Sequence, residues 1–143
     1  MKTIGIAADH AGFGYKEEIA KRLVDQGYSI VDFGTYSSES MDYPDVAHPL
    51  AYGVEQGDVA MGIALCGSGN GINMTLNKHQ GVRSALCWTP EIAALARQHN
   101  DANICAIPAR FLPLETVFAI IDAFLHASFE GGRHQTRVEK IPC

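Results

Sequence analysis

The chain has 143 residues, of which 47% are hydrophobic, and its formal net charge is −5 at pH 7. This length suits one domain with a continuous core, and we expect residues 1–143 to form it. The acidic balance gives no overall basic field for nucleic acid, and no apolar run approaches the ~20 residues that span a bilayer. Because Asp9 and His10 interrupt the first apolar run too early for a signal peptide, we expect a cytoplasmic protein with no membrane or nucleic-acid partner.

Short apolar segments alternate with longer amphipathic ones along the chain. Five segments have the pattern of strands: Thr3–Ala8, Ser29–Phe33, Val59–Leu65, Val82–Cys87 and Asn103–Ile107. Five have the pattern of helices: Gly14–Gln26, Pro44–Glu55, Gly71–Lys78, Pro90–His99 and Pro113–Phe129. The alternation predicts an α/β fold in which a five-stranded parallel sheet carries helices on both faces.

A glycine-rich segment follows the third expected strand. Residues Cys66–Gly71 read Cys-Gly-Ser-Gly-Asn-Gly and lead into the third expected helix. Glycines let backbone N–H groups approach a ligand closely, and a helix N-terminus favours negative charge. A potential nucleophile or base therefore lies beside a potential anion site. Taken alone, the segment could also be a tight turn after a core cysteine, which is the commoner fate of a lone cysteine.

Other polar side chains follow the neighbouring strands. Asp9 and His10 come after the first strand, Tyr43 ends the long irregular stretch after the second, and Arg110 comes after the fifth. Open parallel sheets bind ligands outside the carboxyl ends of their strands. We therefore expect these side chains to gather with Cys66 at one edge of the sheet.

The remaining cysteines and histidines indicate no further site. No C-x-x-C pair occurs, which leaves a zinc ribbon or thioredoxin motif unsupported. Cys87 and Cys105 are expected to be small buried residues of strands. The histidines at positions 48, 79 and 126 are expected to be structural or surface residues, because nothing in the sequence clusters with them.

Five motifs span nearly the whole chain, from Ile4 to about Val138. They are Asp9–Phe13, Asp42–Pro44, Cys66–Gly71, Arg97–Asn103 and Glu130–Arg137. In this order they resemble the motifs of type B ribose-5-phosphate isomerase, in the family that includes galactose-6-phosphate and allose-6-phosphate isomerases. The resemblance implies a three-layer α/β/α sandwich with a Rossmann-like sheet, a homodimer or homotetramer, a phosphosugar substrate, and no metal or cofactor.

The resemblance also implies residue roles. Cys66 would be the base that moves a proton between C1 and C2 of the sugar, and His99 the acid that opens the furanose ring. The absence of an acid in Ile72–Asn77 places the chain in the branch that uses cysteine rather than glutamate. The implied substrate-binding residues are Asp9, His10, Tyr43, Gly67, Ser68, Gly69, Asn70, Gly71, Asn100, Arg110, Arg133 and Arg137.

The implied activity is aldose–ketose isomerisation of ribose 5-phosphate and ribulose 5-phosphate through an enediolate, in the pentose phosphate pathway. Such chemistry needs a base near both carbons, preorganised donors for the developing charge, and an acid for ring opening. Two alternatives stay open: an isomerase of six-carbon phosphosugars such as allose 6-phosphate or galactose 6-phosphate, and a phosphosugar-binding module without catalysis.

The expected fold separates the two implied catalytic residues. The helix Pro90–His99 starts at the carboxyl edge and runs back along the sheet, so its end lies roughly 15 Å away. Arg133 and Arg137, which share a helical face at i, i+4, reach the same far edge. We therefore expect a site shared between two subunits, with residues 130–143 as a C-terminal tail at the interface. One subunit would give Asp9, His10, Tyr43 and Cys66, and the other would give His99 and Asn100.

Overall fold

One parallel sheet forms the centre of the protein in a computed structural model that describes residues 2–143. Its strand order is β2-β1-β3-β5-β4. The strands are β1 (Thr3–Ala8), β2 (Ser29–Asp32), β3 (Met61–Cys66), β4 (Ser84–Leu86) and β5 (Ile104–Pro108). All residues of β3 and β5 are buried, as expected for strands covered on both faces.

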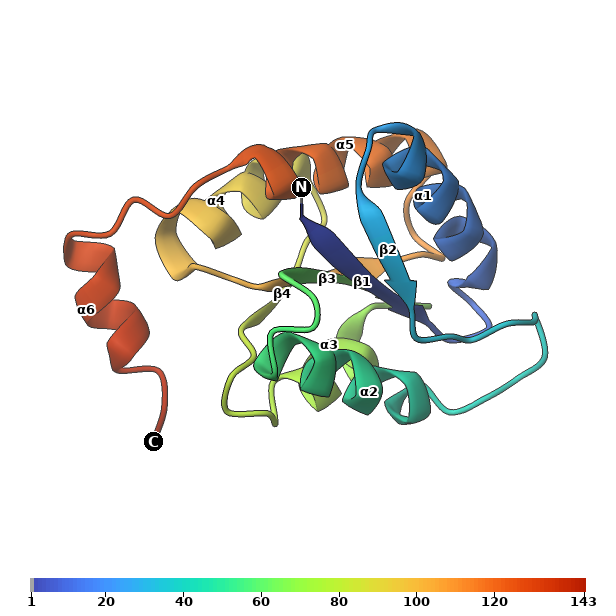
Figure 1. Ribbon diagram of the computed structural model, residues 1–143, viewed down its shortest axis with the longest axis horizontal. Coiled ribbons are helices and arrows are strands. Elements are labelled where there is room, and N and C mark those ends of the chain that lie inside the picture. The colour runs from blue at the N-terminus through green and yellow to red at the C-terminus, as the bar shows by residue number, and fades with distance from the viewer. Residues whose placement is uncertain (1) are drawn as a thin grey trace.

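Helices cover both faces of the sheet (Figure 1). They are α1 (Phe13–Asp25), α2 (Pro44–Glu55), α3 (Asn70–Leu76), α4 (Pro90–Asn100), α5 (Leu114–His126) and α6 (Arg133–Glu139). In the figure α1, α4 and α5 lie over one face, α2 and α3 lie over the other, and α6 stands apart from the sandwich. The expected three-layer α/β/α sandwich is confirmed. Among residues 2–143, no helix is long and apolar enough to cross a membrane.

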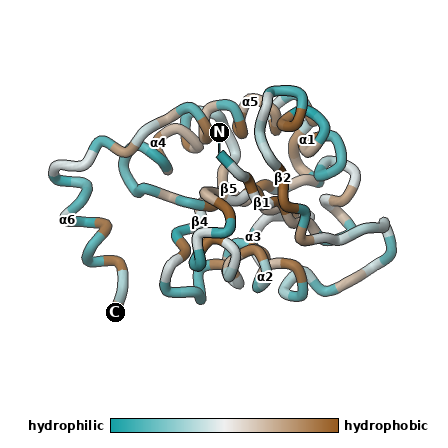
Figure 2. Tube along the Cα trace, viewed as in Figure 1, coloured by the Kyte–Doolittle hydropathy of each residue, from teal (hydrophilic) through white to brown (hydrophobic). Residues whose placement is uncertain are grey.

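Two hydrophobic cores hold the layers together. On one face, Ile19 of α1 and Phe124 of α5 pack with Ile63 of β3. On the other face, Leu50 of α2 and Ile72 of α3 pack with small residues of the sheet. Figure 2 shows hydrophobic and hydrophilic residues alternating along α2, whereas α6 is mostly hydrophilic. The sheet residues alternate between the two cores because successive side chains of a strand point to opposite faces.

Most boundaries differ from the sequence-based expectation by a few residues. The fourth strand is shorter than Val82–Cys87, and Cys87 lies just beyond it, although it is buried. A hydrogen bond with Cys87, together with burial, raises the pKa of the Cys105 thiol well above its ordinary value. The final segment is more ordered than the expected tail, because Arg133–Glu139 forms a helix.

The expectation that His48 and His79 lack a cluster is wrong. Their rings are hydrogen-bonded between Nδ1 of His48 and Nε2 of His79 at 2.7 Å. Nδ1 of His79 lies 3.1 Å from Oε1 of Glu55, and Oε2 of Glu55 accepts a hydrogen bond from the amide of Gly81 at 2.9 Å. His48 and Glu55 both belong to α2, whereas His79 lies in the turn after α3. The three meet only when α2 packs beside that turn, which is why sequence spacing did not reveal them. His126 is exposed, as expected.

Replacing Glu55 by glutamine should lower the melting temperature at pH 7 but not in acid. The amide of Gly81 chiefly, and His79 in addition, hold the pKa of the Glu55 carboxyl below its ordinary value, against a smaller opposing effect of burial. A carboxyl whose folded-state pKa is lowered contributes stability above its unfolded pKa, and this contribution is lost as pH falls through the folded-state pKa. Thermal unfolding followed from pH 7 to about pH 3 should therefore show that the difference in melting temperature between the variant and the wild type disappears. Glu39→Gln, on an exposed loop, is the matched control; a gap independent of pH would contradict the assignment.

Candidate active site

The carboxyl ends of β1 and β3 lie side by side where the chain order reverses, which is the usual ligand position in open α/β sheets. Ala8 at the end of β1 pairs with Leu65 of β3. Asp9 then donates its amide to the carbonyl of Leu65 at 3.1 Å. Since Cys66 is the next residue of β3, this register brings the carboxylate and the thiol to the same place.

Asp9 is held by the turn that follows it. Its Oδ1 accepts hydrogen bonds from the amides of Ala11 at 2.9 Å and Gly12 at 3.3 Å, and the residue is 6% exposed. Oδ1 thus organises the loop and leaves Oδ2 for a ligand. His10 lies beside this turn and accepts a hydrogen bond at Nδ1 from the amide of Met41 at 3.2 Å. An accepting Nδ1 places the proton of the neutral ring on Nε2, which makes Nε2 a donor.

Cys66 ends β3 and is 4% exposed. Its carbonyl accepts from the amide of Ala109, and the carbonyl of Gly67 accepts from the amide of Arg110, both at 3.0 Å. These two bonds join the glycine-rich segment to the loop after β5. The side chain of Arg110 lies over Gly67, where a Cβ atom would be 3.2 Å from its Cδ. A glycine at position 67 therefore lets the guanidinium approach the mouth of the site.

Two further glycines shape the segment. Gly69 has a φ of +75°, a conformation that favours glycine, and it caps the start of α3. A Cβ atom on Gly71 would collide with the ring of Tyr43. The absence of a side chain at position 71 therefore allows Tyr43, at the start of α2, to lie over the glycine-rich segment.

Gly69→Ala should destabilise the fold by about 1–3 kcal/mol, through a strained φ and overpacking. The added methyl would lie 2.5 Å from Cδ1 of Leu86 and 3.1 Å from the carbonyl carbon of Ile107, and the backbone at Ile107 has little freedom to move. Gly14→Ala is the matched control, since a Cβ atom at this position in α1 would meet nothing within 4 Å. Chemical denaturation compares the two free energies of unfolding. Equal effects of the two substitutions would contradict the strain at Gly69.

These elements enclose a pocket of about 500 Å³ at the carboxyl edge. Its lining contains most of the expected residues from this edge and one that sequence reasoning missed, Phe111. The exposed Phe111 ring packs against that of Trp88, with their centroids 5.8 Å apart. The position of Phe111 directly after Arg110 was the sequence signal that could have placed it in the pocket. The lining residues are Asp9, Tyr43, Cys66, Gly67, Ser68, Gly71, Arg110 and Phe111.

Three expected residues lie beside this pocket rather than in its lining: His10, Gly69 and Asn70. Asn70 is exposed as the first residue of α3, and its amide donates to Oγ of Ser68 at 3.2 Å. Gly69 is buried beneath the segment. These positions support the shape of the segment, and direct contact of the three with a substrate stays a prediction.

His99 and Asn100 lie at the opposite edge of the sheet. The carbonyl of Asn100 accepts a hydrogen bond from Nε of Arg83 at 3.1 Å, and the carbonyl of Arg83 accepts from Asn103 at 2.9 Å. Arg83 and Asn103 immediately precede β4 and β5, whereas Cys66 is paired with the last residue of β5. The length of β5 separates the two edges by about 13 Å. The expected separation of Cys66 and His99 within one chain is thus confirmed.

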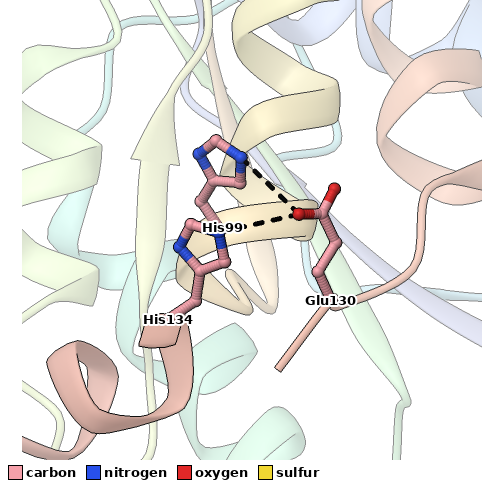
Figure 3. Close-up of side chains that lie close together, drawn as sticks. All are labelled: His99, Glu130 and His134. Atoms are coloured by element: carbon pink, nitrogen blue, oxygen red, sulfur yellow. Dashed lines mark ion pairs between the residues drawn. The ribbon is translucent and has the colours of Figure 1, made fainter. Parts of the chain in front are cut away.

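A second cluster surrounds His99 (Figure 3). Its ring stacks on that of His134 in α6, with centroids 4.1 Å apart and an interplanar angle of 11°. Oε1 of Glu130 lies 3.9 Å from Nε2 of His99 and 3.6 Å from Nε2 of His134. Burial chiefly, and then electrostatic interactions with His99, Arg133 and Arg137, lower the pKa of His134, against an opposing effect of the Glu130 carboxylate. Sequence reasoning did not single out Glu130 and His134 as neighbours of His99. The i, i+4 spacing of Glu130 and His134 was the only sequence signal that these two side chains could lie together.

Arg133 and Arg137 are exposed on α6 and lie with this second cluster rather than with the pocket. The structure therefore groups the expected site residues into two sets. The pocket set lies around Cys66, and the other set consists of His99, Asn100, Arg133 and Arg137.

Comparison with known proteins identifies relatives that share this architecture. The family model described as Ribose/Galactose Isomerase matches residues 4–141. Ribose-5-phosphate isomerase B of Escherichia coli is 48% identical over 141 residues, covering 99% of this chain and 95% of that protein. The Clostridium thermocellum ribose-5-phosphate isomerase B structure has a TM-score of 0.96 at 46% identity, covering 97% of this chain and 94% of that one. The structure of the Mycoplasma genitalium enzyme, with bound ribulose-5-phosphate, has a TM-score of 0.92 at 42% identity and covers 97% of this chain and 93% of that one. The chain belongs to the ribose/galactose isomerase family.

Proposed function

We propose that this protein is an aldose–ketose isomerase that interconverts D-ribose 5-phosphate and D-ribulose 5-phosphate. The observation that carries the proposal is the pocket at the carboxyl edge, where the Cys66 thiol, the Asp9 carboxylate and the glycine-rich segment converge. The Escherichia coli relative and the Mycoplasma genitalium enzyme with its bound ketose support the choice of substrate. A place in the pentose phosphate pathway, in the cytoplasm, follows from this activity.

The reaction moves one proton between adjacent carbons. In its thiolate form Cys66 takes the proton from C2 of the open-chain aldose, and the electron pair moves onto O1 to give the enediolate. The proton of the C2 hydroxyl then passes to O1, and the thiol returns its proton to C1 as the electron pair left on O2 re-forms a carbonyl at C2. In this proposal, backbone amides of the segment Gly67–Gly71 donate to the developing charge, the kind of preorganised interaction that usually contributes most to catalysis. Asp9 offers Oδ2 to a sugar hydroxyl, because Oδ1 is held by the loop.

We further propose that the protein is a single domain, residues 1–143, that works as a homodimer or homotetramer with shared sites. One chain provides the Cys66 pocket, and His99 of the partner subunit opens the sugar ring beside it. The separation of the two sets within one chain supports this arrangement. The position of α6, which stands apart from the sandwich, also supports it (Figure 1). In the proposed arrangement Arg133 and Arg137 of this helix bind the phosphate of the other subunit's substrate.

Turnover of the purified protein on three aldoses tests the proposal. Ribose 5-phosphate should be converted to the ketose with a kcat/KM well above those for allose 6-phosphate and galactose 6-phosphate. Exchange of the C2 proton with deuterated solvent separates catalysis from binding. A preference for either six-carbon substrate would identify a hexose-phosphate isomerase, and binding without exchange would identify a module without catalysis.

A further inference from the structure

We propose that His99, Glu130 and His134 form a binding site for a divalent transition-metal ion such as Zn²⁺, and that occupying this site inhibits the isomerase. The metal acts here as an inhibitor and takes no part in the proposed isomerisation. Binding of the ion stands on the geometry of these three side chains alone. The inhibition rests in addition on the proposed role of His99 in ring opening.

The three side chains direct their ligand atoms toward one place. Figure 3 shows nitrogens of both stacked rings facing the carboxylate of Glu130. One ligand atom from each residue lies within 4.8 Å of the others, and Oε1 of Glu130 is 3.6 and 3.9 Å from the two imidazole nitrogens. Tetrahedral zinc with bonds of about 2.0–2.2 Å holds its ligand atoms about 3.3 Å apart. Because the two rings are stacked at an interplanar angle of 11°, both must tilt so that their in-plane lone pairs converge on an ion that Glu130 also reaches.

His134 provides the independent evidence for a ligand. Its side chain is 8% exposed, and within residues 2–143 its buried Nε2 has no hydrogen-bond partner. Buried polar atoms are normally hydrogen-bonded, so an unpartnered nitrogen facing a carboxylate and a second imidazole needs an explanation. A metal ion at this point would satisfy it.

The backbone around the cluster holds the ligands in place. The amide of Glu130 donates to the carbonyl of Gln98 at 3.0 Å, which ties the carboxylate to the last turn of α4 that carries His99. The amide of His134 donates to the carbonyl of Gly131 at 3.1 Å, at the start of α6. In a single chain the His99 and Glu130 side chains are 38% and 52% exposed, and in the proposed assembly an ion can reach them by the route that brings the sugar to His99.

The donor set selects the class of ion. Two imidazoles and one carboxylate suit zinc and its transition-metal neighbours, whereas Mg²⁺ and Ca²⁺ prefer oxygen ligands. Three protein ligands leave a fourth position for water. The positive charges of Arg133 and Arg137 oppose a cation, so the affinity should be moderate. A metal bound to Nε2 of His99 occupies the lone pair of that nitrogen, which can then no longer carry a proton to the sugar.

Calorimetric titration with Zn²⁺ tests binding without reference to activity. The Cys143→Ser protein serves as the background, because the Cys143 thiol is exposed and could bind zinc itself. We expect one ion per chain, with affinity reduced at least about tenfold by His134→Ala and by Glu130→Gln. Glu130→Gln changes an exposed side chain and guards against misfolding of the variant at the buried histidine. His79→Ala, which removes the other histidine–glutamate contact, is the matched control and should bind as the background does.

Unchanged affinity in both His134→Ala and Glu130→Gln would overturn the site, as would loss of binding in His79→Ala alone. Visible absorption of the Co²⁺ complex gives a second measure: nitrogen and oxygen ligands should produce a tetrahedral spectrum without a thiolate charge-transfer band, and such a band would place the ion on a cysteine.

To test inhibition, the isomerase rate of each protein with zinc is compared with the rate of the same protein without metal. Zinc should slow the background protein and slow Glu130→Gln at least about tenfold less effectively. Zinc binding without inhibition would overturn only the proposal that the ion inhibits the isomerase. A metal-free protein without activity would refute the proposed function instead.

Discussion

Cys66→Ala is expected to lower kcat for ribose 5-phosphate about 10²–10⁴-fold, the usual contribution of a positioned general base. KM should change little, because the amides of the glycine-rich segment and Asp9 stay in place. The substitution removes one sulfur atom from a residue that is 4% exposed, so the protein should remain folded. Steady-state kinetics of the variant measure kcat and KM, and thermal unfolding shows whether it is folded.

The matched control is Cys143→Ser, which removes an exposed thiol at the chain terminus and should leave kcat unchanged. Retention of more than about a tenth of the wild-type kcat in Cys66→Ala would show that another group removes the proton, since losing a base costs at least ~10²-fold. Solvent exchange sharpens this test. Ribulose 5-phosphate has no furanose ring to open, so exchange of its C1 proton should survive in His99→Asn and disappear in Cys66→Ala.

The pocket around Cys66 could be predicted because it depends on local order. Except for Tyr43, which ends the long loop after β2, its residues lie within about five positions of a strand's carboxyl end, and in a parallel sheet those ends share one edge. Strand alternation therefore placed Asp9 and Arg110 beside Cys66, although they are distant in sequence. The Phe111 ring was missed because its direction depends on packing against Trp88, which strand order does not reveal.

Boundaries and clusters formed by packing between helices were less accessible. The third strand begins at Met61 rather than Val59, although Val59 is buried and apolar, because hydrophobicity alone does not determine strand pairing. The contact between His48 and His79 joins α2 to the turn after α3, and the contact between His99 and His134 joins α4 to α6. Neither pair has a spacing that one helix or strand could produce, so only the folded structure brings them together.

Mixing Cys66→Ala with His99→Asn should restore activity that neither variant has alone. In a dimer with shared sites, random assortment makes about half of the dimers mixed, and each mixed dimer has one intact and one doubly altered site, which gives about a quarter of the wild-type activity. The physical reason is the separation of roughly one strand length between Cys66 and the end of α4, which one chain cannot close without unfolding the sheet. The measurement is the rate after joint denaturation and refolding of equal amounts, with each variant refolded alone as the control. Size-exclusion chromatography verifies that the mixture has assembled. A refolded mixture no more active than the mean of its parents would place both residues in one chain's site, and α4 would then have to move toward the carboxyl edge when substrate binds.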